Sequence, residues 1–233
     1  MNVDSDLGVN TLLLDEMVGL LGEVAVDLVF VGGCATGLLV TSSRAQGVRV
    51  TTDVDAVSEA TTITQYHALE KRLRAKGFRH DPDVICRWRV AGLQLDVMPS
   101  GPNVLGFHNR WYPIVAETAS PYLLPSGRSI RLITSPLFLA TKLEAFQDRG
   151  AGDYLASHDL EDIVTVVDGR AELLEEVGGA NEVVRVYLRE RLSALLVIDA
   201  FVDALPGHLS GDAASQARVP IILERLRRLA TAT

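Results

Sequence analysis

The stretch that most limits how this chain can fold runs from Val26 to Val40 and reads VDLVFVGGCATGLLV. Its first six residues are mostly apolar and β-branched, as in a buried strand, and Gly32-Gly33 ends the strand where Cys34 can begin a helix. Glycines at such a turn let an anion approach the unpaired N–H groups of the helix start without a Cβ in the way. The stretch therefore predicts either a phosphate site or a plain strand-to-helix turn.

Two acidic residues follow on a second strand-like segment, TTDVDAV at residues 51–57. Because side chains alternate along a strand, Asp53 and Asp55 are expected on one face. Adjacent carboxylates raise each other's pKa unless they are solvated or neutralised, and a divalent cation is the usual means of keeping both ionised. Their oxygen ligands favour Mg²⁺. The segment predicts a metal site or a solvated acidic face.

A third acid, Asp96, lies among apolar neighbours in the strand-like segment LQLDVM at residues 93–98. An acid in such a strand is costly if it is unpaired, so it needs a metal, an arginine or a set of hydrogen bonds. We interpret Asp96 as a third metal ligand.

Helical spacing in the second half of the chain brings two cations together. On a helix predicted at residues 137–149, Lys142, Phe146 and Arg149 are four and three residues apart and share a face. The alternative is an ordinary solvated face paired with acids of the same helix.

A further helix is predicted after a glycine break at residues 150–152, with Ser157 as its N-cap. Asp159 and Asp162 lie three apart on it, so they too are expected to share a face.

The chain resembles the nucleotidyltransferase superfamily with the polymerase-beta-like core in three features: the glycine turn, the DxD pair of Asp53 and Asp55, and the acid Asp96 on a later strand. In that family the first two acids hold both metals, and the third completes one site and can activate the attacking hydroxyl. The resemblance implies two Mg²⁺ ions, with Mn²⁺ as an alternative. It assigns metal binding and catalysis to Asp53, Asp55 and Asp96, and nucleotide binding to Gly32, Gly33 and Cys34.

The later pattern A-x-K-x-x-A-x-x-x-R followed by D-x-x-D resembles the AbiEii/MenT-type nucleotidyltransferases, the toxin halves of certain toxin–antitoxin pairs. This resemblance implies that Lys142 grips the triphosphate and takes part in catalysis, while Arg149 and Asp162 order the nucleotide site. Two features depart from the family: Cys34 replaces the usual Ser or Thr, and nineteen residues separate Gly33 from Asp53, which requires an inserted turn at residues 42–47.

The expected fold class is α+β, a mixed nucleotidyltransferase sheet with flanking helices plus a C-terminal helical bundle. Residues 1–134 are expected to form the catalytic core, and residues 135–233 a helical domain that closes the cleft. Strands are predicted at residues 26–31, 51–57, 85–90, 93–98, 122–124 and 129–133, with Ala91-Gly92 joining a hairpin and the chain extended from 114 to 133. Helices are predicted at residues 9–24, 34–40, 63–76, 136–149, 157–168, 170–177, 181–204 and 214–230.

Composition narrows the functional classes. The 233 residues are 48% hydrophobic, yet charges or glycine interrupt every apolar run, so we expect a soluble cytoplasmic protein without a membrane partner. Cys34 and Cys86 have no CxxC or histidine neighbours, which argues against a structural zinc or a disulfide framework. A net charge of −8 argues against a broad nucleic-acid-coating surface, although local arginines could still contact RNA.

The expected function is transfer of a nucleoside monophosphate from an NTP to an acceptor hydroxyl. By resemblance the acceptor is the 3′ end of tRNA, and the protein is a toxin with a cognate antitoxin. An enzyme that modifies an antibiotic or a protein hydroxyl remains open, as does a non-catalytic nucleotide-binding domain.

Overall fold

The computed structural model describes residues 3–42, 47–149 and 152–231, and the chain divides into two compact units. The first, here called the sheet unit, consists of Ser5–Gly37 and Arg49–Thr134; the second, the helical unit, consists of Met1–Asp4, Leu38–Val48 and Ser135–Thr233. Parts of the predicted turn at 42–47 and of the glycine break at 150–152 lie outside the described residues. The functional division at residue 134 stays a prediction.

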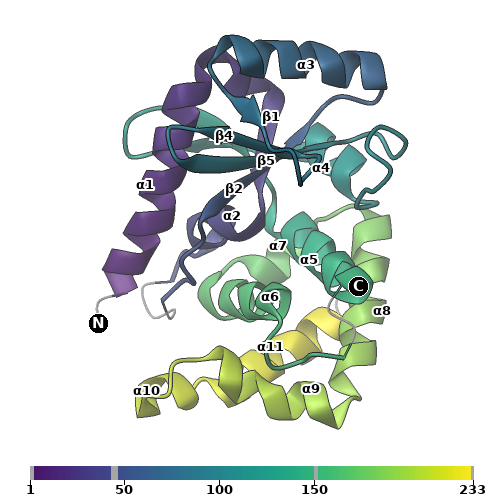
Figure 1. Ribbon diagram of the computed structural model, residues 1–233. Helices are drawn as coiled ribbons and strands as arrows, with labels where there is room; N and C mark the ends of the chain where they lie inside the picture. The colour runs from purple at the N-terminus through teal and green to yellow at the C-terminus, as the bar shows by residue number, and fades with distance from the viewer. Residues whose placement is uncertain (1–2, 43–46, 150–151, 232–233) are drawn as a thin grey trace. The chain divides into compact units, whose positions relative to one another are not determined.

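In the described residues, seven strands form one mixed sheet in the order β3-β4-β5-β2-β1-β7-β6. Figure 1 labels β1, β2, β4 and β5 of this sheet. Strands β2 and β5 are parallel, as are β1 and β7, and the other neighbours are antiparallel. The strands are β1 Leu28–Val31, β2 Asp53–Ser58, β3 Arg79–His80, β4 Arg87–Val90, β5 Leu93–Pro99, β6 Ser120–Leu123 and β7 Ser129–Leu132. This mixed sheet with helices confirms the predicted α+β class.

Eleven α-helices are found in the described ranges: α1 Val3–Leu21, α2 Gly32–Leu39, α3 Ile63–Ala75, α4 Tyr112–Thr118, α5 Ser135–Arg149, α6 His158–Gly169, α7 Leu173–Gly178, α8 Glu182–Leu196, α9 Asp199–Ala204, α10 Ala213–Gln216 and α11 Val219–Thr231. Short 3₁₀ segments, Gly22–Asp27 and Leu205–His208, precede β1 and follow α9. None of the described helices is both long and apolar enough to cross a membrane.

One face of the sheet is packed with apolar side chains. Val54, Leu95 and Trp88 are neighbours across three strands and are fully buried. Helix α3 is anchored to the sheet by Tyr66, whose hydroxyl donates a 2.8 Å hydrogen bond to the carbonyl of Val97. Because side chains alternate along a strand, the residues between these face the opposite side, and these include the predicted acids.

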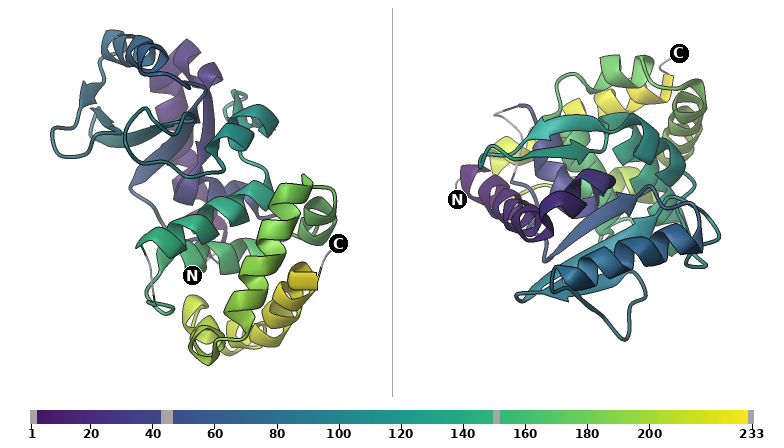
Figure 2. Two further views of the ribbon diagram at one scale, coloured as in Figure 1. Left: turned by 90° about the vertical axis from the view of Figure 1, so that its right-hand side faces the viewer. Right: turned by 90° about the horizontal axis from the view of Figure 1, so that it is seen from above.

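The helical unit is an all-α bundle in which α5 is buried along most of its length. Helix α11 packs against α8 and α6 through the stripe Ile222, Leu226 and Leu229, and Figure 2 shows α8 and α11 side by side. Ser157 caps α6 by accepting a hydrogen bond from the amide of Leu160, which confirms its predicted role. The predicted C-terminal helical bundle is therefore present.

Three predicted elements were wrong in detail. Residues 112–118 form α4 rather than extended chain, because Pro113 in the first turn starts a helix after the Asn109 turn. The predicted helix 181–204 is broken at Val197 and Ile198: α8 ends before Val197, and the backbone is extended at Ile198, although the apolar period continues. The last helix begins at Val219 because Pro220 fits the first turn but not a helix interior.

Candidate active site

Strand register brings the three predicted acids to one face of the sheet unit. Asp55 on β2 is directly opposite Asp96 on the parallel strand β5, and Asp53 is opposite Gln94. Residues in register share a face, as do residues two apart on one strand. Asp53 and Asp55 are half-buried, and Asp96 is 8% exposed. The three carboxylates therefore come from adjacent strands on the same face.

Arg87 of β4 is a member of this site that the sequence interpretation did not assign. It is opposite Asp96 in the antiparallel β4–β5 pair. Its Nε and Nη2 atoms donate to the two carboxylate oxygens of Asp96 at 2.8 and 2.7 Å, and Nη2 is also 3.4 Å from Oδ2 of Asp53. These hydrogen bonds, together with the two negative charges, raise the pKa of Arg87 above its usual value.

A simple signal could have found Arg87. The predicted two-residue hairpin turn at Ala91-Gly92 fixes the register of its strands, so Val90 must face Leu93 and Arg87 must face Asp96.

As a metal site, the three aspartates supply suitable oxygen donors, but the carboxylates of Asp53 and Asp96 contact Arg87. Within residues 3–42, 47–149 and 152–231, no three His, Cys, Asp or Glu side chains are gathered in a metal-binding arrangement. Arg87 instead supplies the positive charge for Asp96 and Asp53. The guanidinium of Arg87 lies where a metal ion would lie between the two carboxylates. Their oxygen atoms are donors that suit Mg²⁺ if the contact with Arg87 opens. The assignment of Asp53, Asp55 and Asp96 to metal binding stays a prediction.

The glycine turn lies against the acids. Helix α2 begins at Gly32, whose φ of 67° lies in the left-handed region that favours glycine. A Cβ added at Gly32 would overlap the carboxylate of Asp55. Glycine is therefore required for the Asp55 side chain to lie this close to the backbone of Gly32. The structure thus places the predicted phosphate turn beside one predicted metal ligand.

Cys34, in the same turn, directs its side chain inward. The thiol is buried and donates to the carbonyl of Val31 at 3.2 Å. Only the backbone N–H of Cys34 could therefore serve a phosphate, as the missing Ser or Thr hydroxyl already indicated. Burial also raises the pKa of the other cysteine, Cys86, to about 11, because the thiolate would be desolvated and would face the charge of Asp96.

A clamp from α1 holds the chain just before β2. Asn10 donates to the carbonyl of Arg49 at 2.8 Å and accepts from the amide of Thr51 at 3.0 Å. Thr51 in turn donates to Oδ1 of Asp53 at 2.7 Å. A Cβ added at Gly33 would lie 2.9 Å from Nη2 of Arg49, so this guanidinium lies over the glycine turn. Sequence reasoning missed this clamp because the two contacts of Asn10 span 39 and 41 positions.

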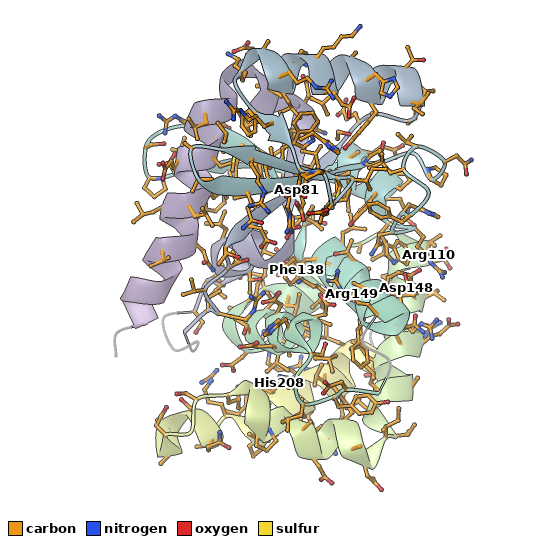
Figure 3. The ribbon with its side chains drawn as sticks, in the orientation of Figure 1. Asp81, Arg110, Phe138, Asp148, Arg149 and His208 are labelled. Atoms are coloured by element: carbon orange, nitrogen blue, oxygen red, sulfur yellow. The ribbon has the colours of Figure 1, made fainter. Side chains whose placement is uncertain are left out.

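The remaining predicted site residues form an ion cluster inside the helical unit. Lys142 on α5 is 8% exposed, and its Nζ lies 3.1 Å from Asp159 and 2.6 Å from Asp162 on α6. Arg149, labelled on α5 in Figure 3, donates two hydrogen bonds of 3.0 and 3.1 Å to Asp159. Burial opposes ionisation of Asp159, but Lys142 and Arg149 outweigh it and hold its pKa below the ordinary value.

The predicted residues thus fall into two sets. One set, comprising the glycine turn and the three acids, lies in the sheet unit, and the other set, Lys142, Arg149 and Asp162, lies in the helical unit with Asp159. The roles predicted for the second set in nucleotide binding stay predictions.

Comparisons with known proteins place the chain only loosely. No family model matches it, and no curated protein matches it. A solved structure described as "Crystal structure of putative nucleotidyltransferase from H. pylori" aligns over 96% of this chain and 91% of its own, with 13% identity and a TM-score of 0.43. A likeness this distant does not by itself establish fold or activity.

Proposed function

We propose that this protein is a metal-dependent nucleotidyltransferase that transfers a nucleoside monophosphate from an NTP to an acceptor hydroxyl and releases pyrophosphate. The observation that supports the proposal is the location of Asp53, Asp55 and Asp96 on one face of two adjacent strands, with the carboxylate of Asp55 against the glycine turn at Gly32. Phosphoryl transfer is mainly a matter of positioning and charge stabilisation, which such an arrangement supplies.

Each part of the site has a role in that reaction. Asp53, Asp55 and Asp96 would hold two Mg²⁺ ions, which supply charge stabilisation for the attacking and leaving oxygens. The N–H groups at the start of α2 would bind the triphosphate. Asp96 would accept the proton of the acceptor hydroxyl. The hydroxyl oxygen would then bond to the α-phosphorus of the NTP as the bond between the α-phosphorus and pyrophosphate breaks.

For the acceptor, we propose the 3′ end of tRNA, with the protein acting as a toxin opposed by a cognate antitoxin. This part rests on the resemblance of the Lys142 and Arg149 helix and the Asp162 helix to AbiEii/MenT-type enzymes. In that scheme Lys142 would leave its acidic partners to bind the triphosphate. A hydroxyl of an antibiotic or of a protein is the alternative acceptor.

The test is pyrophosphate release from each NTP with Mg²⁺ and total tRNA. We expect Asp55→Asn to reduce the rate more than about a hundredfold, since several kcal/mol of charge stabilisation would be lost. Asp83→Asn, which changes an exposed acid of the same unit, is the matched control and should retain the wild-type rate. A wild-type rate in Asp55→Asn would contradict the proposal.

A non-catalytic nucleotide-binding domain is the second candidate, and the Arg87–Asp96 ion pair favours it because that pair neutralises Asp96 without a metal. It predicts NTP binding that is insensitive to EDTA, with no pyrophosphate release from any NTP.

A further inference from the structure

We propose that Arg87 is a built-in counter-ion of Asp53 and Asp96, and that a divalent cation must displace Arg87 before it can bind to these acids. The inference rests on the proposed function, since it assumes that the carboxylates hold a metal during the reaction. It adds that the affinity of the site for that metal is set by a residue of the chain itself.

The position of Arg87 carries the argument. Its guanidinium makes a two-point contact with Asp96 and reaches Asp53 through one of the same nitrogens. A cation shared by these two carboxylates would occupy the space between them, where the guanidinium now lies, and would compete with it for the same oxygens. Arginine and metal are therefore competitors rather than neighbours.

The local charge balance explains why a metal ion can displace Arg87 from the two carboxylates. One guanidinium carries a single positive charge but contacts two carboxylates, Asp53 and Asp96. A divalent cation brings twice that charge to the same oxygens. The Arg87 side chain is 22% exposed, so it can move toward water without leaving a buried, unpaired charge.

This arrangement has a functional consequence. Without metal, the hydrogen bonds of Arg87 hold the side chains of Asp53 and Asp96 in place, so this part of the sheet face stays ordered. With metal, binding has to break charge-assisted hydrogen bonds first, and the apparent affinity falls accordingly. Arg87 would thus be a positioning residue that sets the metal concentration at which the site becomes active.

The chain offers a matched control. Arg89 lies two residues further along β4 on the same face, but its Nε contacts Asp81 at 2.5 Å rather than the three acids. Asp81 is labelled in Figure 3. Replacing either arginine by glutamine removes one charge from the same strand, and only Arg87→Gln removes a competitor of the metal.

The experiment is a titration of the full chain with Mn²⁺, without nucleotide, followed by calorimetry and by the electron paramagnetic resonance signal of free Mn²⁺. We expect Arg87→Gln to bind Mn²⁺ about tenfold more tightly than wild type, because the metal no longer breaks charge-assisted bonds. Arg89→Gln should bind as wild type does, and Arg87→Lys, which keeps the charge but loses the two-point contact, should be intermediate.

A second measurement separates competition from a general structural effect. In EDTA, Arg87→Gln should melt at a lower temperature than wild type, because its carboxylates repel one another, and Mn²⁺ should raise its melting temperature by more than it raises that of wild type. If Arg87→Gln does not fold, Arg87→Lys carries both measurements.

The outcomes distinguish this inference from the proposed function. Equal or weaker Mn²⁺ binding in the Arg87 variants, with clear binding by wild type, would overturn the competition and leave the enzyme proposal standing. Binding of Mn²⁺ by none of the proteins would overturn the metal site, and both proposals with it.

Discussion

The two units each hold a cluster of aspartates and cations, and the clusters differ in the number of acids that each cation contacts. In the helical unit, Asp159 and Asp162 meet Lys142 and Arg149, two acids against two cations, around a buried lysine. In the sheet unit, Asp53 and Asp96 share the single guanidinium of Arg87 on a partly exposed face.

The comparison separates two uses of the same residue types. A cluster with equal numbers of acids and cations around a buried lysine has its charges satisfied within the protein and is best suited to fixing two helices against each other. A partly exposed cluster with more negative than positive charge attracts further cations. Under the proposed function, we therefore expect metal binding in the sheet unit and a structural role for the pairs around Lys142 in the absence of nucleotide.

The largest loss of stability is expected when the ion cluster of the helical unit is broken. Lys142→Met should lower the free energy of unfolding by about 3–5 kcal/mol, because Asp159 and Asp162 would stay buried without their main partner. Urea unfolding followed by circular dichroism measures this change.

Arg149→Gln is the control for that variant. Its side chain is 70% exposed, and we expect a cost below about 1 kcal/mol. A Lys142→Met protein that is as stable as wild type would reverse the comparison, since the ion pairs of Lys142 would then not hold α5 and α6 together.

A smaller loss of stability tests whether the position of Asp55 in the sheet unit depends on Gly32. Gly32→Ala should cost about 2–4 kcal/mol, from left-handed strain together with displacement of the Asp55 carboxylate. Gly77→Ala, which also has positive φ but open space around the new methyl group, should cost only the strain, about 1–2 kcal/mol. Equal costs for the two variants would mean that Asp55 does not depend on Gly32, and thermal or urea unfolding decides this.

The smallest effect concerns pH. The pKa of Asp159 in the folded protein lies below the value of 3.8 expected without these contacts, so its contribution is fully present above that pH and is lost as the pH falls through the folded pKa. Urea unfolding at pH 5 and pH 3 should therefore show a smaller acid loss in Asp159→Asn than in wild type. Equal losses would show that Asp159 is not held ionised by its partners.

Local patterns were enough to predict the parts of the site that depend on periodicity. Alternation placed Asp53 and Asp55 on one face, and the glycine pair ended β1 and opened α2. These features follow from steric rules that act over a few residues. The pairing of Arg87 with Asp96 also follows from a local feature, the register of the two-residue hairpin at Ala91-Gly92.

Other features depend on contacts between distant segments, which no local pattern encodes. The clamp of Asn10 on Arg49 and Thr51 joins residues 39 and 41 positions apart. Likewise, the spacing of Lys142 and Arg149 predicted a shared helix face, but it could not tell whether that face would meet a ligand or the acids of the next helix. Burial of Lys142 beside α6 was decided by helix packing.

The most direct test of the metal site is a crystal of the wild-type protein grown with Mn²⁺ and a non-hydrolysable NTP, with anomalous scattering recorded for manganese. We expect anomalous peaks at carboxylate oxygens of Asp53, Asp55 and Asp96, with Arg87 turned away from Asp96. Bound nucleotide without a manganese peak at these carboxylates, and with the Arg87–Asp96 ion pair intact, would contradict the account.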